Sequence, residues 1–207
     1  MKPGSLICLI GLIGLVSCRQ EGSKPVTETS SRGLIPFAVG KKWSYVSTSF
    51  DSLGREVSSH EDGTTVTGDT VVAGEKWYAL TDDSAGHRFG DAFYATNRQD
   101  GVYMLGSRGT ATLLFRFPAA LGDTSPPYIV RSVDTAVSCP AGIFRCYLYR
   151  DTVAVSADHG RIWAIVTNDY FAPGVGMVRH ELKTQWRDTL TGRAWAGPGE
   201  IRVASGF

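Results

Sequence analysis

The chain has 207 residues, of which 21 are Lys or Arg and 20 are Asp or Glu, so its formal net charge is +1 at neutral pH. Charges so nearly balanced give no long-range attraction to a polyanion, so we expect no nucleic-acid partner. The part of the chain with a globular composition is long enough to form one domain with its own core.

Residues 1–17 have the pattern of an export signal and are not expected to be part of the fold. Lys2 is followed by the apolar run Leu6 to Val16, which is too short and too rich in glycine to span a bilayer of roughly 30 Å. The run ends in Leu-Val-Ser-Cys at positions 15–18, which resembles the lipobox of bacterial lipoproteins. The resemblance implies that Cys18 becomes the new N-terminus and carries acyl chains. The alternatives are an ordinary secretory signal and a buried N-terminal strand.

Residues 18–33 are expected to form a flexible tether between the lipid and the folded domain. From Arg19 onward this segment has no aliphatic residue except Val26 and is rich in Ser, Thr, Gly and charged residues, so it cannot bury enough surface to fold. The residue after Cys18 is Arg and not the Asp associated with inner-membrane retention. We therefore expect a protein of the bacterial cell envelope, attached to the outer membrane through the acylated Cys18.

Residues 34–207 are expected to form a single antiparallel β domain with little helix. Turn signals recur about every eight to twelve residues, which is typical of antiparallel strands and not of alternating strands and helices. The stretch closest to a helical period, Ala111 to Gly122, is interrupted by Pro118. We predict a strongly curved sheet or an open barrel.

The predicted strands alternate with turns along the chain. In order, they are Lys42 to Phe50, a hairpin of Thr64 to Val72 and Glu75 to Thr81 around Ala73-Gly74, a pair Arg88 to Asn97 and Val102 to Ser107 around Gln99-Asp100-Gly101, and Thr110 to Phe117 before a loop to Pro127.

The most continuous β pattern lies between Tyr128 and Leu182. Two successive strands there must place their apolar faces on one side of the sheet, which allows two turns. A four-residue loop would close Cys139 on Phe144, whereas a Gly142-Ile143 turn would place Cys139 opposite Cys146 and permit a disulfide. We favour the loop and two buried thiols. Further on, Arg161 to Thr167 is apolar on both faces, which predicts a central, covered strand.

Three motifs carry a family resemblance: W-x-Y at Trp43 to Tyr45, P-A-G-x-F at Pro140 to Phe144, and A-P-G-V-G-x-V at Ala172 to Val178. In this order they resemble a broad group of uncharacterised bacterial exported lipoproteins. The resemblance implies a β-rich extracytoplasmic domain and no particular activity. Cys139 departs from the pattern, in which an aliphatic residue is expected before Pro-Ala-Gly.

No motif points to a reaction, and we expect no catalytic residue, no cofactor and no metal. The four His residues include no H-E-x-x-H pair, and the chain has no C-x-x-C, P-loop, dinucleotide fingerprint or nucleophile elbow. Asp158 and His159, in the Ser156 to Gly160 loop, are an adjacent acid and imidazole that we take as the candidate pair for a hydrolase. Neighbouring side chains on a turn usually point apart, so we interpret this pair as structural.

The expected function is therefore non-enzymatic: a lipid-anchored envelope lipoprotein that acts as a binding or assembly module for an unknown protein or apolar ligand. Two alternatives stay open. One is a carrier of lipid or another apolar ligand, because curved sheets can enclose such cavities. The other is a hydrolase that uses Asp158 and His159. A cavity lined by aromatic side chains would favour the carrier, and a cleft joining the pair to a Ser would favour the hydrolase.

Acylation of Cys18 should hold the protein on membranes, because each buried acyl CH₂ contributes about 0.8 kcal/mol and stable anchoring takes more than one chain. Metabolic labelling with palmitate should mark wild-type protein in the membrane fraction, and Cys18→Ala should lose the label. Cys139→Ser is the matched control and should keep it. Recovery of wild-type protein from the periplasm with an unmodified Cys18 would contradict the prediction.

Overall fold

The computed structural model describes residues 33–83, 93–157 and 161–207 of the chain. Within these ranges the chain forms twelve β-strands and no helix, so no helix of this part could cross a membrane. The strands are β1 (Lys42–Phe50), β2 (Glu56–Val72), β3 (Glu75–Asp82), β4 (Phe93–Arg98), β5 (Gly101–Leu105), β6 (Ala111–Arg116), β7 (Thr124–Ser125), β8 (Tyr128–Cys139), β9 (Gly142–Ala157), β10 (Arg161–Ala172), β11 (Gly176–Asp188) and β12 (Ala194–Gly206).

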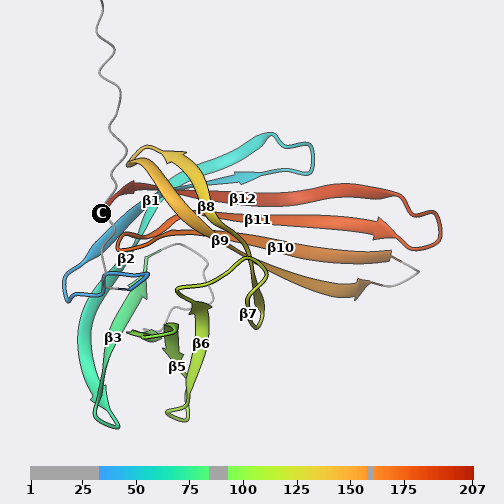
Figure 1. The fold of residues 1–207 in the computed structure, drawn as a ribbon. Helices are drawn as coiled ribbons and strands as arrows, with labels where there is room; N and C mark the ends of the chain where they lie inside the picture. Colours follow the sequence, from blue (N-terminus) through green and yellow to red (C-terminus); the bar gives the residue numbers. More distant parts are fainter. Residues whose placement is uncertain (1–32, 84–92, 158–160) are drawn as a thin grey trace, which may run out of the picture.

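The strands form one antiparallel sheet that curls into a nearly closed barrel (Figure 1). Their order is β6-β5-β4-β3-β2-β1-β12-β11-β10-β9-β8-β7, so the first and last strands of the chain are neighbours inside the sheet. The two edge strands, β6 and β7, lie on either side of a seam that backbone pairing leaves unsealed in the described part. The prediction of an all-β antiparallel domain, either a strongly curved sheet or an open barrel, is confirmed.

Side-chain hydrogen bonds link the two sides of this seam. The hydroxyl of Ser125 in β7 donates to the carbonyl oxygen of Leu114 in β6 at 3.0 Å. The hydroxyl of Tyr149 in β9 donates to the carbonyl oxygen of Arg116 at 2.7 Å. Both bonds satisfy backbone groups of an edge strand that would otherwise need a neighbouring strand.

Aromatic packing joins the same two sides. The ring of Phe115 in β6 lies within 4.5 to 5.0 Å, centroid to centroid, of Phe171, Tyr128 and Tyr149 on the opposite side. These tilted arrangements are the ones that aromatic pairs favour. The barrel therefore closes through a side-chain core and not through a continuous ladder.

The β2–β3 hairpin turns at Ala73-Gly74, as predicted. Both residues have positive φ, 51° for Ala73 and 82° for Gly74, and Val72 pairs with Glu75 across the turn. Two successive positive φ values are the mark of the type I′ turn, whose twist matches that of the paired strands.

The prediction for the next hairpin is displaced by one residue. The turn consists of Gln99 and Asp100, because Arg98 pairs with Gly101. Gly101 is instead the first residue of β5, where a Cβ atom would collide with the carbonyl oxygen of Phe115. The glycine permits the close approach of β6 and is not the turn residue that the Asp-Gly pair suggested.

The β8–β9 hairpin turns at Pro140-Ala141, because Cys139 pairs with Gly142. Neither predicted turn is present, since both were centred later in the chain. Pro at the second position and Gly at the fourth are favoured in β-turns, which accounts for the tighter connection. The apolar faces of β8 and β9 nevertheless lie on the same side of the sheet, as predicted, and Val137 pairs with Phe144.

Cys139 and Cys146 are both free thiols, so the disulfide alternative is wrong. In this register Cys146 lies opposite Thr135, which removes it from the position facing Cys139. Cys146 is fully buried, and burial raises the pKa of its thiol to about 12, whereas Cys139 is only half-buried. Two thiols are confirmed, but only one of them is buried as predicted.

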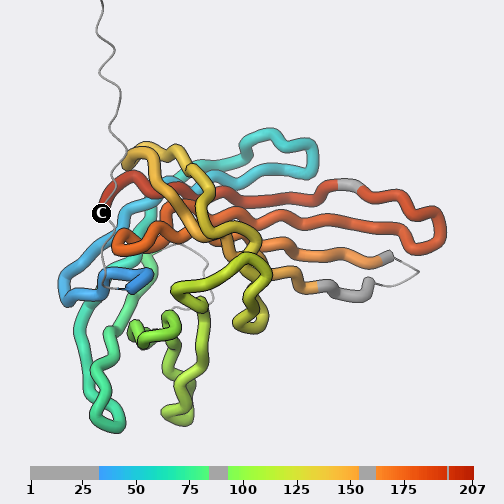
Figure 2. Tube along the Cα trace, viewed as in Figure 1, coloured from blue at the N-terminus to red at the C-terminus, as the bar shows by residue number. Residues whose placement is uncertain are grey.

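Strand β10 is central in the sheet but is not covered, which corrects the prediction for Arg161 to Thr167. It pairs with β9 and with β11, and together with β12 these strands extend beyond the barrel as a four-stranded arm (Figures 1 and 2). Ile162 on this arm is 39% exposed. The fully buried part of β10 is the later segment Asn168–Asp169 and Phe171–Ala172, where the strand enters the barrel.

The segment before β1 packs into the barrel. Leu34 is completely buried, and Ile35 and Phe37 contact two of the core clusters. The amide of Asn97 donates to the carbonyl oxygen of Ile35 at 2.6 Å, and the backbone N–H of Gly174 donates to the carbonyl oxygen of Gly33 at 3.2 Å. These contacts fix the start of the described chain against β4 and the β10–β11 turn.

Candidate binding cavity

The barrel contains a cavity of about 300 Å³. Its wall is contributed by strands on both sides of the seam and by the segment before β1, so it forms only when the sheet has curled. Its lining is mainly apolar and aromatic, with Ile35, Phe37, Trp43, Leu80, Phe93, Ala95, Val102, Met104, Leu114, Phe115, Phe171 and Met177 among the residues that form it.

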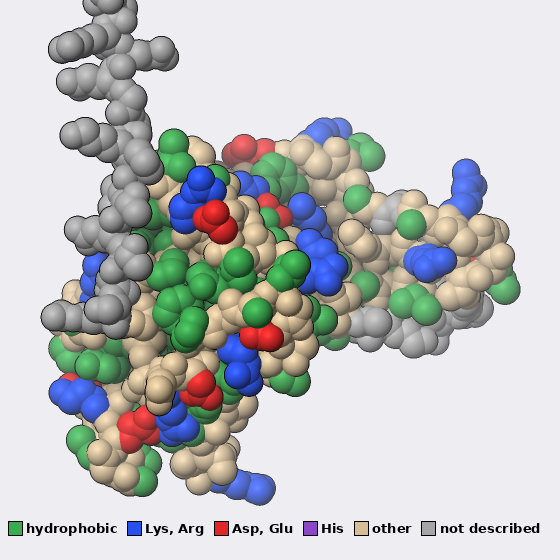
Figure 3. Space-filling view, viewed as in Figure 1, with side chains coloured by type: hydrophobic (Ala, Val, Ile, Leu, Met, Phe, Trp, Pro, Cys, Tyr) green, Lys and Arg blue, Asp and Glu red, His purple; other side chains and the backbone are tan. Residues whose placement is uncertain are grey.

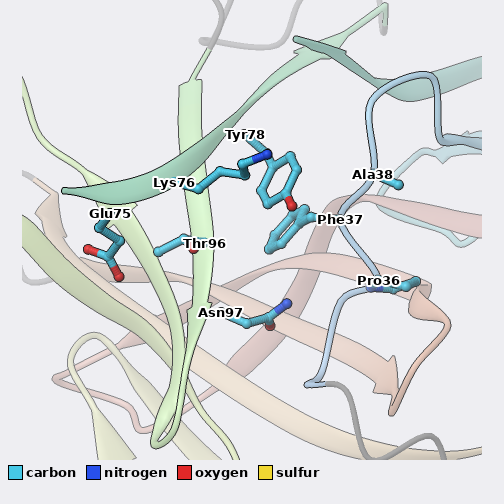
Figure 4. A pocket seen from close by; sticks show the side chains of 8 residues that line it. All are labelled: Pro36, Phe37, Ala38, Glu75, Lys76, Tyr78, Thr96 and Asn97. Carbon is cyan, nitrogen blue, oxygen red and sulfur yellow. The ribbon is translucent and has the colours of Figure 1, made fainter. Parts of the chain in front are cut away.

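A second hollow of about 610 Å³ lies between residues 36–38 and strands β3 and β4 (Figure 4). The rings of Phe37 and Tyr78 stack there with their centroids 5.5 Å apart. Phe37 lines both spaces, so it forms part of the wall between them. Because this hollow also carries the polar side chains of Glu75, Lys76, Thr96 and Asn97, we place the candidate site in the more apolar inner cavity.

A row of polar side chains crosses the inner face of the sheet. Ser47 in β1 pairs with Arg202 in β12, Arg202 with His180 in β11, and His180 with Asp169 in β10. Residues paired directly across antiparallel strands share one face of the sheet. Arg202, His180 and Asp169 accordingly line the same cavity.

Arg202 is the centre of a buried ion-pair network. Its Nε donates to Asp62 Oδ1 at 2.7 Å, and its Nη1 donates to Asp82 Oδ2 at 2.9 Å. The guanidinium also lies 4.2 Å from the ring centroid of Tyr45, and Ser47 Oγ donates to Asp62 at 2.6 Å. The side chains of Arg202 and Asp62 are only 4% and 1% exposed, so these charges depend on each other for compensation.

His180 and Asp169 form a second polar pair in the cavity wall. His180 Nδ1 and Asp169 Oδ1 are 2.6 Å apart, and the charge of Asp169 also acts on the nearby Tyr128 hydroxyl. Burial lowers the pKa of His180, but the hydrogen bond and the charge of Asp169 outweigh it, so the pKa lies above its ordinary value. Burial, reinforced by the nearby carboxylates, raises the pKa of Tyr128 and keeps its hydroxyl neutral.

The site found in the structure differs from the one that the sequence suggested. Cys18, Asp158 and His159 lie outside the described residues. The Asp169–His180 pair was not predicted. Counting outward from a two-residue Pro173-Gly174 turn would place Asp169 opposite Val178. Asp169 faces His180 because Ala172 pairs with Gly176 and the register shifts between Tyr170 and Phe171, and neither feature was predicted from the sequence.

The described residues around His180 show no nucleophile–base pair and no metal-ligand cluster. Among the described residues, the hydrogen bonds of the His180 imidazole lead to Asp169 and not to a hydroxyl or thiol that it could activate. No group of three His, Cys, Asp or Glu side chains in that part of the chain is placed to hold a metal ion. Both signs of charge are interspersed over the barrel half of the face drawn in Figure 3.

Comparison with known proteins gives two solved structures of similar fold. No family model matches the chain, and no curated protein matches it. A protein of Bacteroides fragilis, described as exported and as having a YmcC-like fold, is 11% identical, with 84% of this chain and 98% of that chain covered and a TM-score of 0.49. A protein of Parabacteroides distasonis described as a lipoprotein is 14% identical, with 84% and 97% covered and a TM-score of 0.44. Both TM-scores lie below 0.5, and the two matches assign neither a family nor a function to this chain.

Replacing Arg202 by Met should strongly destabilise the fold, because Asp62 and Asp82 would lose the guanidinium that compensates their charges. Removal of one member of a buried ion pair costs roughly 3 to 5 kcal/mol in the free energy of unfolding. Urea denaturation measures the change. Arg145→Met is the matched control: its 3.4 Å pair with Asp134 is well exposed, so a loss of no more than about 1 kcal/mol is expected. Equal effects of the two substitutions would contradict the buried network.

His180 should make stability depend on pH. Because its folded pKa is raised above the ordinary value of 6.5, its contribution is fully present below about pH 6.5 and is lost as the pH rises through the folded pKa. The free energy of unfolding, measured by urea titration from pH 5.5 to 8.5, should therefore fall less steeply in His180→Gln than in wild type. Arg145→Met, an exposed substitution that changes no imidazole, should keep the wild-type slope. An unchanged slope in His180→Gln would refute the assignment.

Proposed function

We propose that the protein is a lipid-anchored component of the bacterial cell envelope that binds a small apolar ligand inside its barrel. The observation that carries the proposal is the inner cavity, whose lining is mainly apolar and aromatic. Ligand sites in proteins are typically concave, apolar and fitted with a few polar groups, and their volumes begin at about 300 Å³. The carrier alternative is thus favoured over the assembly module.

Rigid aromatic packing around the cavity supports the same function. Phe115 and Phe171 line the cavity and contact each other, with their centroids 4.5 Å apart. Tyr149 packs against both of them and is itself completely buried. Side chains held in this way leave a preformed space, which reduces the ordering cost of binding. The unsealed seam beside Phe115 provides a side on which the barrel can open.

The envelope location rests on the export signal and on Cys18. Attachment to the outer membrane would place the cavity close to a large supply of apolar molecules while the tether allows the domain to reach them. The hydrolase alternative has less support, since it depends on Asp158 and His159, which lie outside the described residues. The proposed role is therefore a carrier and not an enzyme.

Binding should be detected with N-phenyl-1-naphthylamine, an uncharged apolar molecule that fluoresces in apolar surroundings. The mature chain with Cys18→Ala, which carries no acyl chains that could compete, should bind it with one site per molecule. Met104→Trp should weaken binding at least tenfold by filling the cavity, whereas Met104→Leu, which nearly conserves volume, should bind within about threefold of wild type. Equal affinity in both variants would refute the proposed site.

A further inference from the structure

The hollow beside β3 and β4, here called the outer hollow, shares a wall with the inner cavity. Phe37 lines both spaces, and its ring stacks on that of Tyr78, with an angle of 19° between the ring planes. Ile35 in the same segment lines the inner cavity, whereas Ala38 lines the outer hollow. The segment before β1 therefore lies between an apolar space of about 300 Å³ and a more polar space of about 610 Å³.

Phe37 is a part of this wall that a ligand could displace. The side chain is only partly buried and has no hydrogen-bonding group, so packing alone holds its ring in place. Rotamers of exposed side chains interconvert on the order of nanoseconds or faster, and a half-exposed ring has part of that freedom. A turn of the ring out of the wall would join the two spaces into one.

The charged side chains of the outer hollow already have partners. Among the described residues that line it, these are Glu75 and Lys76. Arg98 donates to both carboxylate oxygens of Glu75, at 2.9 and 2.7 Å, and Lys76 Nζ lies 2.9 Å from Asp69 Oδ2. A charged ligand group would have to displace one of these partners or lie beside a compensated pair, so it would gain little from its charge.

The same two side chains keep hydrogen-bonding capacity for an uncharged group. A carboxylate has about four acceptor positions and an ammonium group has three donors, of which Arg98 takes two and Asp69 takes one. The side chains of Glu75 and Lys76 are 32% and 57% exposed, so a ligand in the hollow can reach the remaining positions. Hydroxyl groups, which both donate and accept, suit such a mixed set.

Aromatic rings border these polar groups. Figure 4 shows the stacked rings of Phe37 and Tyr78 in the same hollow as Lys76 and Thr96. Aromatic side chains supply a large apolar surface, against which the C–H face of a sugar ring packs. Aromatic rings beside hydrogen-bonding side chains of both kinds therefore suit a hydroxyl-rich ring better than an ionic group.

We infer, on the basis of the proposed cavity ligand, that the ligand is an amphiphile of the glycolipid type. Its apolar chain occupies the inner cavity, and its uncharged, hydroxyl-rich group occupies the outer hollow. The chain passes Phe37, which marks the boundary between the two parts of the ligand. The inner cavity selects for an apolar chain, and the outer hollow selects the polar group that the chain carries.

Three amphiphiles with the same ten-carbon chain test this assignment: decyl glucoside, decyl sulfate and decanol. Each competes with N-phenyl-1-naphthylamine for the mature Cys18→Ala chain, below its micelle concentration. Decyl glucoside should bind at least fivefold more tightly than decyl sulfate. Equal affinity for these two would overturn the inference while leaving the proposed function intact.

Ala38→Trp, made in the same chain, tests where the sugar lies. Ala38 is exposed and lines the outer hollow but not the inner cavity, so the indole should fill the hollow alone. Decyl glucoside should then bind at least fivefold more weakly, while decanol and the fluorophore stay within twofold. Val39→Trp is the matched control: Val39 is 57% exposed and lines neither of the two spaces, so all affinities should stay within twofold.

Two results with Ala38→Trp would overturn the inference and leave the proposed function intact. One is an unchanged affinity for decyl glucoside, and the other is an equal loss of decyl glucoside and decanol. Failure of the parent chain to bind the fluorophore and decanol would instead overturn the proposed function together with this inference.

Discussion

The buried pairing of Arg202 with Asp62 and Asp82 is the constraint on which the curvature of the barrel depends. Strands β12 and β3 are separated by β1 and β2, and neighbouring strands lie about 4.8 Å apart, so in a flat sheet β12 and β3 would be about 14 Å apart. Side chains stand roughly perpendicular to a sheet, so on a flat sheet those of Arg202 and Asp82 could not meet. Their 2.9 Å hydrogen bond can form only when the sheet is curled around them. The network thus favours one curvature over flatter alternatives, in addition to any net stability that it contributes.

Because side chains close the barrel at its seam, the curvature of the sheet is linked to the access that a ligand would have to the cavity. A barrel closed by a full ladder has no edge, whereas here β6 is joined to β7 and β9 by two hydrogen bonds and by the rings around Phe115. Rearranging a few aromatic contacts requires less free energy than breaking a row of backbone hydrogen bonds. Phe115 and Phe171 belong both to this closure and to the cavity lining, so opening at the seam leads directly into the cavity.

Local chemistry accounts for the parts of this fold that the sequence predicts. The Ala73-Gly74 turn and the bounds of β1 follow from turn residues and alternation, which act within a few positions. Gly101 shows the limit of such reasoning. A glycine is needed at this position because a Cβ atom would collide with Phe115, a residue of another strand. The Arg202–Asp62 bond joins positions 140 residues apart, and no local pattern specifies it, because it exists only after β12 has paired with β1. The cavity could not be predicted from the sequence for the same reason, since it forms only after distant strands have paired.

The polar pair in the cavity wall also bears on stability. Asp169 and His180 lose hydration when the barrel forms, and their contact, 2.6 Å between Oδ1 and Nδ1, offsets part of that cost. A ligand that binds only the folded state stabilises it by RT ln(1 + [L]/Kd), so occupancy and stability rise together. The ligand proposed for this cavity would therefore also stabilise the barrel that encloses it.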